Sequence, residues 1–213
     1  LCWHNNDRTI IMYNPKTDSQ RNIVEHALSM FRERGIKGVR MDDVANEMRV
    51  SKRTLYEMFI DKEHLLLECV KLNAELKERK FAEYLSHSKG VIDILCFFVK
   101  VGLEEFSNYN AKFFVDVLKY QLVKDYIDSR KEKDIIIRKK FFREGVRQGL
   151  LVDNVNFDLL ARVNEAAFNT LVNEKIYDQY LPKDIFNTFI MVFLRGILTE
   201  KGLKELENSL AVK

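Results

Sequence analysis

Apolar residues recur at helical spacing along most of the chain, and no segment shows the sustained alternation of a β-strand. The first apolar stripe lies between Asp18 and Arg34. It predicts a helix that ends at Gly35, a residue suited to the left-handed position after a helix. The apolar positions of this stripe are Ile23, Val24, Ala27, Leu28 and Phe31. The pattern predicts an all-α fold.

Two short helices are predicted next, over residues 41–48 and 52–58, with a tight connection between them. Asp42 and Asp43 lie in the first turn of the former, where negative charge is favourable, and Ser51 can cap the latter. A basic cluster surrounds the start of the second helix: Arg49, Lys52 and Arg53. This is the plan of a helix-turn-helix, in which the second helix enters the DNA major groove by its N-terminal end.

Longer helices are predicted beyond this segment, over about residues 62–85, 90–107, 111–128, 133–148, 157–174 and 183–200. We therefore expect a three-helix DNA-binding domain over residues 16–61 and a larger helical domain over residues 62–213. Residues 1–15 begin without Met and lack a helical period, so we expect an extension that is disordered or left from cloning.

Composition narrows the class of protein. The chain has 213 residues and a net charge of only +3, so the position of the basic residues matters more than their number. Its cysteines and histidines lack metal-ligand spacing, and no cofactor is predicted. No phosphate loop or nucleophile motif indicates an enzyme. Without a membrane span or a secretory pattern, a cytoplasmic protein is expected.

The start of the second short helix carries the candidate DNA contacts. Lys52 and Arg53 can reach phosphates or guanine edges, and Thr54 can donate to a phosphate or touch a thymine methyl. Tyr56 and Lys62 can reach phosphates. The alternative is a solvated basic turn between two surface helices. Residue spacing favours the DNA interpretation, through Ala45, Val50, Ser51, Leu55, Tyr56, Phe59 and Lys62.

At these positions the chain resembles the TetR family of bacterial transcriptional regulators. The family pattern places an acid, an aliphatic residue and Ala on the second helix, followed by a Gly-Val-Ser turn. Thr, an aliphatic residue, Tyr, Phe, Lys and an acid come next. The matching residues are Asp43, Val44, Ala45, Val50, Ser51, Thr54, Leu55, Tyr56, Phe59, Lys62, Glu63 and Leu65. The resemblance covers residues 18–67, and beyond them only helix count and length agree.

Three residues depart from the family pattern. Arg40 replaces the usual cap of the second helix, so that cap is lost or moves to Asp42. Arg49 replaces the turn Gly: a left-handed backbone there would cost about 1 kcal/mol, whereas a remodelled turn would add a phosphate contact. Met58 replaces a residue that often contacts the DNA backbone. The predicted DNA-binding residues are Arg40, Arg49, Ser51, Lys52, Arg53, Thr54, Tyr56 and Lys62.

The resemblance implies a homodimer that binds a near-palindromic double-stranded DNA operator, with half-sites roughly 34–36 Å apart. Wide apolar faces on the last two predicted helices also require a partner, either across a twofold axis or within the monomer. The predicted dimer-interface residues are Leu160, Val163, Ala167, Leu171, Phe186, Phe189, Ile190, Phe193 and Ile197.

The resemblance also implies a repressor that a small effector releases from DNA. The aromatic-rich residues 91–142 could line the effector pocket or simply fill the core. Our candidates are Phe98, Phe114, Tyr120, Tyr126 and Phe168. Because this region shows no obvious inward charge, and the basic residues of 130–143 are expected on a solvated face, we expect an apolar or aromatic effector. The alternative is a regulator of the same fold without a small effector, controlled by a protein partner.

Overall fold

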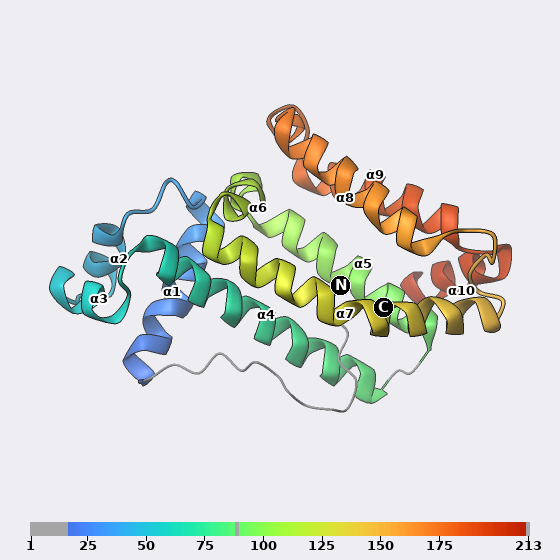
Figure 1. The fold of residues 1–213 in the computed structure, drawn as a ribbon, viewed down its shortest axis with the longest axis horizontal. Helices are drawn as coiled ribbons and strands as arrows, with labels where there is room; N and C mark the ends of the chain where they lie inside the picture. The colour runs from blue at the N-terminus through green and yellow to red at the C-terminus, as the bar shows by residue number, and fades with distance from the viewer. Residues whose placement is uncertain (1–16, 88–89, 212–213) are drawn as a thin grey trace. The chain divides into compact units, whose positions relative to one another are not determined.

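The computed structural model describes residues 17–87 and 90–211, except for the side chains of 87, 111, 131–134 and 172. The predicted extension, residues 1–15, lies outside the described residues. The described chain is helical apart from turns and one isolated bridge between Leu151 and Leu198, so the all-α prediction is confirmed (Figure 1). No helix in these residues is both long enough and apolar enough to cross a lipid bilayer.

The helices follow the predicted order with two differences. Their bounds are α1 (Asp18–Arg34), α2 (Met41–Glu47), α3 (Lys52–Met58), α4 (Lys62–His87), α5 (Val91–Asn108), α6 (Ala111–Asp116), the 3-10 turn η1 (Val117–Lys119), α7 (Gln121–Arg147), α8 (Phe157–Asn173), the 3-10 turn η2 (Ile176–Asp178), α9 (Pro182–Ile197) and α10 (Glu200–Ala211).

The first difference lies between α6 and α7. Residues 111–128 were expected to form one helix, but Tyr120 has an extended backbone (φ −95°, ψ 121°) and interrupts it. Helix α7 then continues through residues 129–132, where a break was expected, because no Gly or Pro stands there.

The second difference is an additional helix at the C-terminus. Leu198 is extended (φ −89°, ψ 141°), which ends α9 at Ile197. The hydroxyl of Thr199 then accepts the N–H of Gly202 at 3.1 Å and caps α10. This local cap divides a segment that the apolar pattern alone joined to the preceding helix.

The described chain forms two compact units. The first unit comprises residues 17–80 and 108–133, so α1–α3 pack together with most of α4, with α6 and with the start of α7. Its core is closely filled: Val24, Phe31, Val44, Leu55 and Leu65 each have less than 1% of their surface exposed. Within this unit α2 and α3 follow one another beside α1 (Figure 1).

The second unit comprises residues 81–107 and 134–211. Its core joins α5 to the end of α7, to α9 and to α10, through residues such as Leu95, Leu151, Leu194 and Leu206. Phe186 of α9 fills the space beside Gly102 of α5, where a Cβ would lie 2.1 Å from its ring. The glycine therefore allows these two helices to pack closely.

Buried charge in the first unit differs from the sequence prediction. Arg130 was expected on a solvated face, but it forms an ion pair with Glu78, and the two side chains are only 11% and 12% exposed. Arg130 also donates to the hydroxyl of Tyr126 at 3.1 Å. Glu75, 4% exposed, pairs with Arg79. The expectation of a solvated face was therefore wrong for Arg130, because its partner Glu78 lies 52 positions away and gives no local signal in the sequence.

Candidate nucleic-acid interface

Helix α3 is fixed at its N-terminus and on its inner face. Ser51 is its N-cap, and the Oγ of Ser51 accepts the N–H of Thr54 at 3.0 Å. Leu55 and Phe59 are 0% and 2% exposed and anchor the helix in the core of the first unit. The structure therefore turns the remaining faces of α3 outward. Ser51 and Thr54 also share a hydrogen bond between their hydroxyls, at 2.7 Å.

The start of α2 is stabilised by Asp43, which was not predicted as its cap. Asp43 Oδ2 accepts the main-chain N–H of Arg40 at 2.7 Å. The expected transfer of the cap to Asp42 is therefore replaced by a bond from Asp43 back to the residue before the helix. The backbone of Arg40 is extended (φ −102°, ψ 159°), and the residue is exposed.

The turn between α2 and α3 contains a left-handed residue. Arg49 has φ +53°, and only Lys175 shares a positive φ among the non-glycine residues that the structure describes. The N–H of Val50 closes the turn by donating to Ala45 at 3.0 Å. Of the two possibilities for Arg49, the structure shows the left-handed backbone, which costs a residue with a Cβ about 1 kcal/mol. Its side chain is exposed.

The cations on α3 already have acidic partners. Lys52 Nζ lies 2.6 Å from Asp42 Oδ2, and this bond raises the pKa of Lys52. Arg53 Nε lies 2.8 Å from Glu57 Oε1, one helical turn further on. Tyr56 is 47% exposed beside them. The cations were predicted as DNA contacts but their acidic partners were not, although the spacing of Arg53 and Glu57 is a local signal for a pair.

Lys62 lies in a different environment from the one expected. Its ammonium donates to the carbonyl oxygen of Ile36 at 2.5 Å and lies 5.9 Å from the ring centroid of Phe31. Partial burial lowers the pKa of this lysine. A phosphate contact by Lys62 would have to replace or share the bond to Ile36, so the structure assigns it first to holding the loop after α1.

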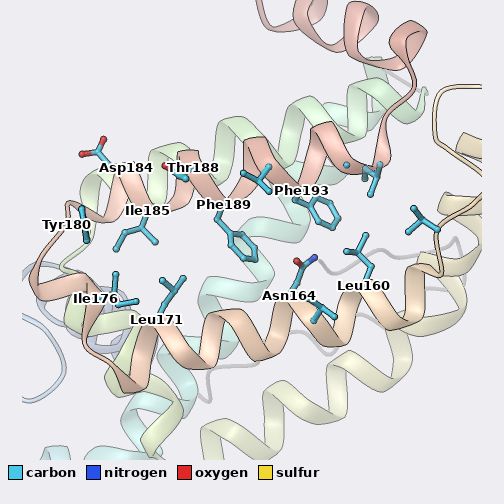
Figure 2. Close-up of a pocket in the computed structure, with 15 residues that line it drawn as sticks. Leu160, Asn164, Leu171, Ile176, Tyr180, Asp184, Ile185, Thr188, Phe189 and Phe193 are labelled. Atoms are coloured by element: carbon cyan, nitrogen blue, oxygen red, sulfur yellow. The ribbon is translucent and has the colours of Figure 1, made fainter.

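A long apolar groove lies between α8 and α9 in the second unit (Figure 2). Its volume is about 600 Å³, and Leu171, Ile185 and Phe189 point into the space between the two helices. Val163 and Val192, which also line it, are 54% and 70% exposed. The groove is therefore an uncovered apolar surface rather than a filled core.

The predicted dimer-interface residues lie partly in this groove and partly in the core of the second unit, and Leu160, Phe193 and Ile197 contribute to both. Six of them line the groove: Leu160, Val163, Leu171, Phe189, Phe193 and Ile197. Phe186 instead stacks on Phe106 of α5, with ring centroids 4.9 Å apart, and Ile190 packs against the core of the second unit. Ala167 does not line the groove. The apolar face of α9 is wide enough both to line the groove and to pack in the second unit. Residue spacing alone could not assign each residue to one of these two roles.

The five aromatic candidates for an effector pocket are divided between the two units. Phe114, Tyr120 and Tyr126 belong to the first unit, whereas Phe98 and Phe168 belong to the second. The ring of Phe114 stacks on Tyr109 at 5.6 Å, and the ring of Phe98 contacts Phe81 and Phe97. None of the five lines the groove or the smaller polar cavity of about 300 Å³ beside α5 and α10.

The all-α fold, together with the capped and outward-facing helix α3, defines a protein with a helix-turn-helix DNA-binding surface. Residues 23–69 match the sequence model of the family described as "Bacterial regulatory proteins, tetR family". The resemblance of this helix-turn-helix segment to the TetR family of DNA-binding transcription regulators, predicted from the sequence, is therefore confirmed. No curated protein matches the chain significantly.

Solved structures share the fold over most of the chain. A TetR-family transcriptional regulator from Agrobacterium tumefaciens aligns with a TM-score of 0.66 at 13% identity, covering 87% of this chain and all of that one. A transcriptional regulator from Saccharomonospora viridis in complex with choline gives 0.65 at 20% identity, with 84% and 97% covered. The fatty acid degradation regulator FadR from Bacillus halodurans gives 0.61 at 15%, with 86% and 98% covered.

Proposed function

We propose that this regulator is a homodimeric repressor whose α3 enters the major groove of a near-palindromic operator. The supporting observation is the geometry of α3: a capped N-terminus, a buried inner face and exposed Lys52, Arg53 and Tyr56 on the others. A helix presented in this way can place side chains on base edges, while cations before and after it contact phosphates.

The α8–α9 groove supports the dimer. Two antiparallel helices with an apolar face can pack against the same pair in a second copy and form a four-helix bundle. Such an arrangement would cover Val163 and Val192, which are otherwise exposed. A dimer of this kind carries two α3 helices, one for each of two half-sites about one turn of DNA apart.

Selection of bound sequences from a random duplex pool, at about 150 mM salt, tests this function. We expect a near-palindrome whose half-site spacing gives the dimer geometry. If folded, dimeric protein enriched no sequence, helix α3 would not be a reader of bases, and the proposed function would be rejected.

For control of the repressor, we propose release by a small apolar or aromatic effector. The fold accommodates small molecules in other proteins, as the choline complex of the Saccharomonospora viridis regulator illustrates. The second candidate is control by a protein partner without a small effector. It is favoured by the packing of predicted pocket aromatics against neighbouring rings, as in the stacking of Phe114 on Tyr109 and the contact of Phe98 with Phe97.

Fractionated extract of the host cell separates these two candidates. Protein bound to the selected operator is challenged with the dialysable fraction and, separately, with the dialysed protein fraction. Release by the dialysable fraction alone supports a small effector. Release by the protein fraction alone, with no effect of the dialysable one, would replace the effector with a partner.

A further inference from the structure

The helix-turn-helix contains two kinds of cation. Lys52 and Arg53, on α3, each contact a carboxylate of the same unit: Lys52 Nζ lies 2.6 Å from Asp42 Oδ2, and Arg53 Nε lies 2.8 Å from Glu57 Oε1. Arg40 and Arg49, before and after α2, are exposed and have no ion-pair partner in the described part of the chain. The charges best placed to reach bases are therefore the ones that are neutralised.

The acidic partners belong to the same exposed surface as the cations. The side chains of Asp42 and Glu57 are 46% and 61% exposed, and those of Lys52 and Arg53 are 62% and 88% exposed. Pairs this exposed are weak and exchange readily with other partners. They contribute little to the stability of the fold, so we expect their main effect to be on DNA binding.

A phosphate backbone and a matching base affect these pairs differently. Non-specific DNA offers mainly phosphates, and a cation that leaves its acid for a phosphate also leaves a carboxylate near the negatively charged backbone. A matching site offers more: Arg53 can donate two hydrogen bonds to a guanine, and Glu57 can accept from a cytosine amino group. The acids therefore penalise binding wherever base contacts do not compensate.

We propose that Asp42 and Glu57 are specificity-determining residues of the DNA-binding surface, because they restrain Lys52 and Arg53 until base contacts replace the ion pairs. The inference rests on the proposed function of α3 as the recognition helix. The unpaired Arg40 and Arg49 then provide the sequence-independent part of binding. The ratio of operator affinity to random-DNA affinity is the quantity that the two acids raise.

The test compares Asp42→Asn and Glu57→Gln with a matched control, Glu25→Gln. Glu25 forms the same kind of pair, with its Oε1 2.9 Å from Arg21 Nε one turn away, but on α1 rather than on α2 or α3. All three variants raise the net charge of the first unit by one. Dissociation constants are measured over a series of salt concentrations for the selected operator and for a duplex of the same base composition in scrambled order, called the shuffled duplex.

We expect Asp42→Asn and Glu57→Gln each to tighten binding to the shuffled duplex roughly five-fold, and to steepen its salt dependence by about one phosphate contact. Operator affinity should change less, so the ratio should fall. Glu25→Gln should leave the ratio as in the wild type. Equal effects of all three variants would mean that only net charge matters, and would overturn the inference.

A double-variant cycle separates the local pair from a general charge effect. In a Lys52→Met background, Asp42→Asn should no longer change binding to the shuffled duplex, because the cation that Asp42 restrains is absent. A full effect in that background would reject the role of the pair. If the wild type selected no operator, the proposed function would be rejected. The effect of the variants on binding to shuffled DNA does not depend on that selection, so the two failures can be distinguished.

Discussion

The main-chain N–H of Asn110 donates to the carbonyl oxygen of Arg32 at 2.7 Å and ties the end of α1 to the start of α6. The guanidinium of Arg32 lies 4.5 Å from the ring centroid of Tyr109 and donates to Asn73 of α4 at 2.5 Å. One arginine thus connects α1 with α4 and with the segment before α6. The helix that supports the DNA-binding surface is therefore attached to the rest of the first unit by polar contacts as well as by its apolar core.

Replacing Arg32 with Leu should lower the free energy of unfolding by about 1.5–3 kcal/mol, because a charge-assisted hydrogen bond and the contact with Tyr109 are lost. Urea denaturation followed by circular dichroism measures the change. Arg21→Leu is the control, since its pair with Glu25 is exposed and should contribute less than about 1 kcal/mol. Equal losses in the two variants would show that the Arg32 contacts add nothing beyond a surface pair.

Arg49→Gly should make the protein more stable and a weaker DNA binder. Glycine removes about 1 kcal/mol of strain from the left-handed position but increases the freedom of the unfolded chain, so we expect a net gain of at most about 0.5 kcal/mol. Loss of the exposed guanidinium should weaken binding to operator and shuffled DNA alike. Arg49→Asn, which also tolerates the left-handed region, should show the same loss of affinity. Unchanged affinity in both variants would exclude Arg49 from the interface.

The N-terminal part of the fold was predictable because its signals are local. The apolar spacing of α1, the cap at Ser51 and the anchors Leu55 and Phe59 each specify structure within a few residues, and the observed bounds of α1 and α3 match the predicted ones. Helix α10 was missed although its signal, a capping threonine at position 199, is also local, because the apolar pattern before it continues past the end of α9.

The ion pairs between distant residues were not predictable, because they depend on which parts of the chain meet on folding. The pair between Arg130 and Glu78 joins residues 52 positions apart, and Lys52 meets Asp42 only after α2 and α3 have packed. A basic residue at helical spacing is consistent with either a solvated or a buried position. The side chain of Arg130 is largely buried because α4 packs against α7 and brings Glu78 next to it.

Breaking the buried pair on one side should be costly. Glu78→Gln leaves the Arg130 guanidinium in a position where the side chain is only 11% exposed, and we expect a loss of about 3–5 kcal/mol. The double variant Glu78→Leu/Arg130→Met should recover most of that loss, since no uncompensated charge remains. Equilibrium denaturation of the single and double variants measures both. A double variant as unstable as the single one would show that the pair itself, rather than the unpaired charge, determines stability.

Asp61, the residue immediately before helix α4, carries a charge that should be visible in the pH dependence of stability. Asp61 Oδ1 accepts the N–H of His64 at 2.9 Å, and this bond, together with the His64 side chain, lowers the pKa of the carboxyl. A lowered folded-state pKa stabilises the protein above the pKa of the unfolded chain, and the effect is lost as the pH falls through the folded-state value.

Asp61→Asn keeps a capping side chain but cannot titrate. The difference in unfolding free energy between the wild type and this variant should therefore shrink as the pH falls below about 4. Denaturation curves at several pH values between neutral and acid conditions give this difference directly. A difference that stays constant over that interval would show that the charge of Asp61 does not stabilise α4.

The apolar groove between α8 and α9 gives the most direct test of dimerisation. Val192 lines the groove and is 70% exposed, so Val192→Glu should leave each protomer folded while placing a charge at the surface where a second copy would pack. We expect the variant to sediment as a monomer and to bind the selected operator at least ten-fold more weakly, because two half-sites can no longer be held together.

Asn187→Glu adds the same charge to the exposed surface of α9 without lining the groove, and it should remain dimeric with unchanged affinity. Analytical ultracentrifugation and operator binding, measured on the same preparations, distinguish the two variants. Because Phe186 of the same helix packs against α5, the two faces of α9 have different roles, and a substitution on the groove face should affect assembly before it affects the fold. A Val192→Glu protein that remains dimeric and binds the operator normally would place the dimer interface elsewhere.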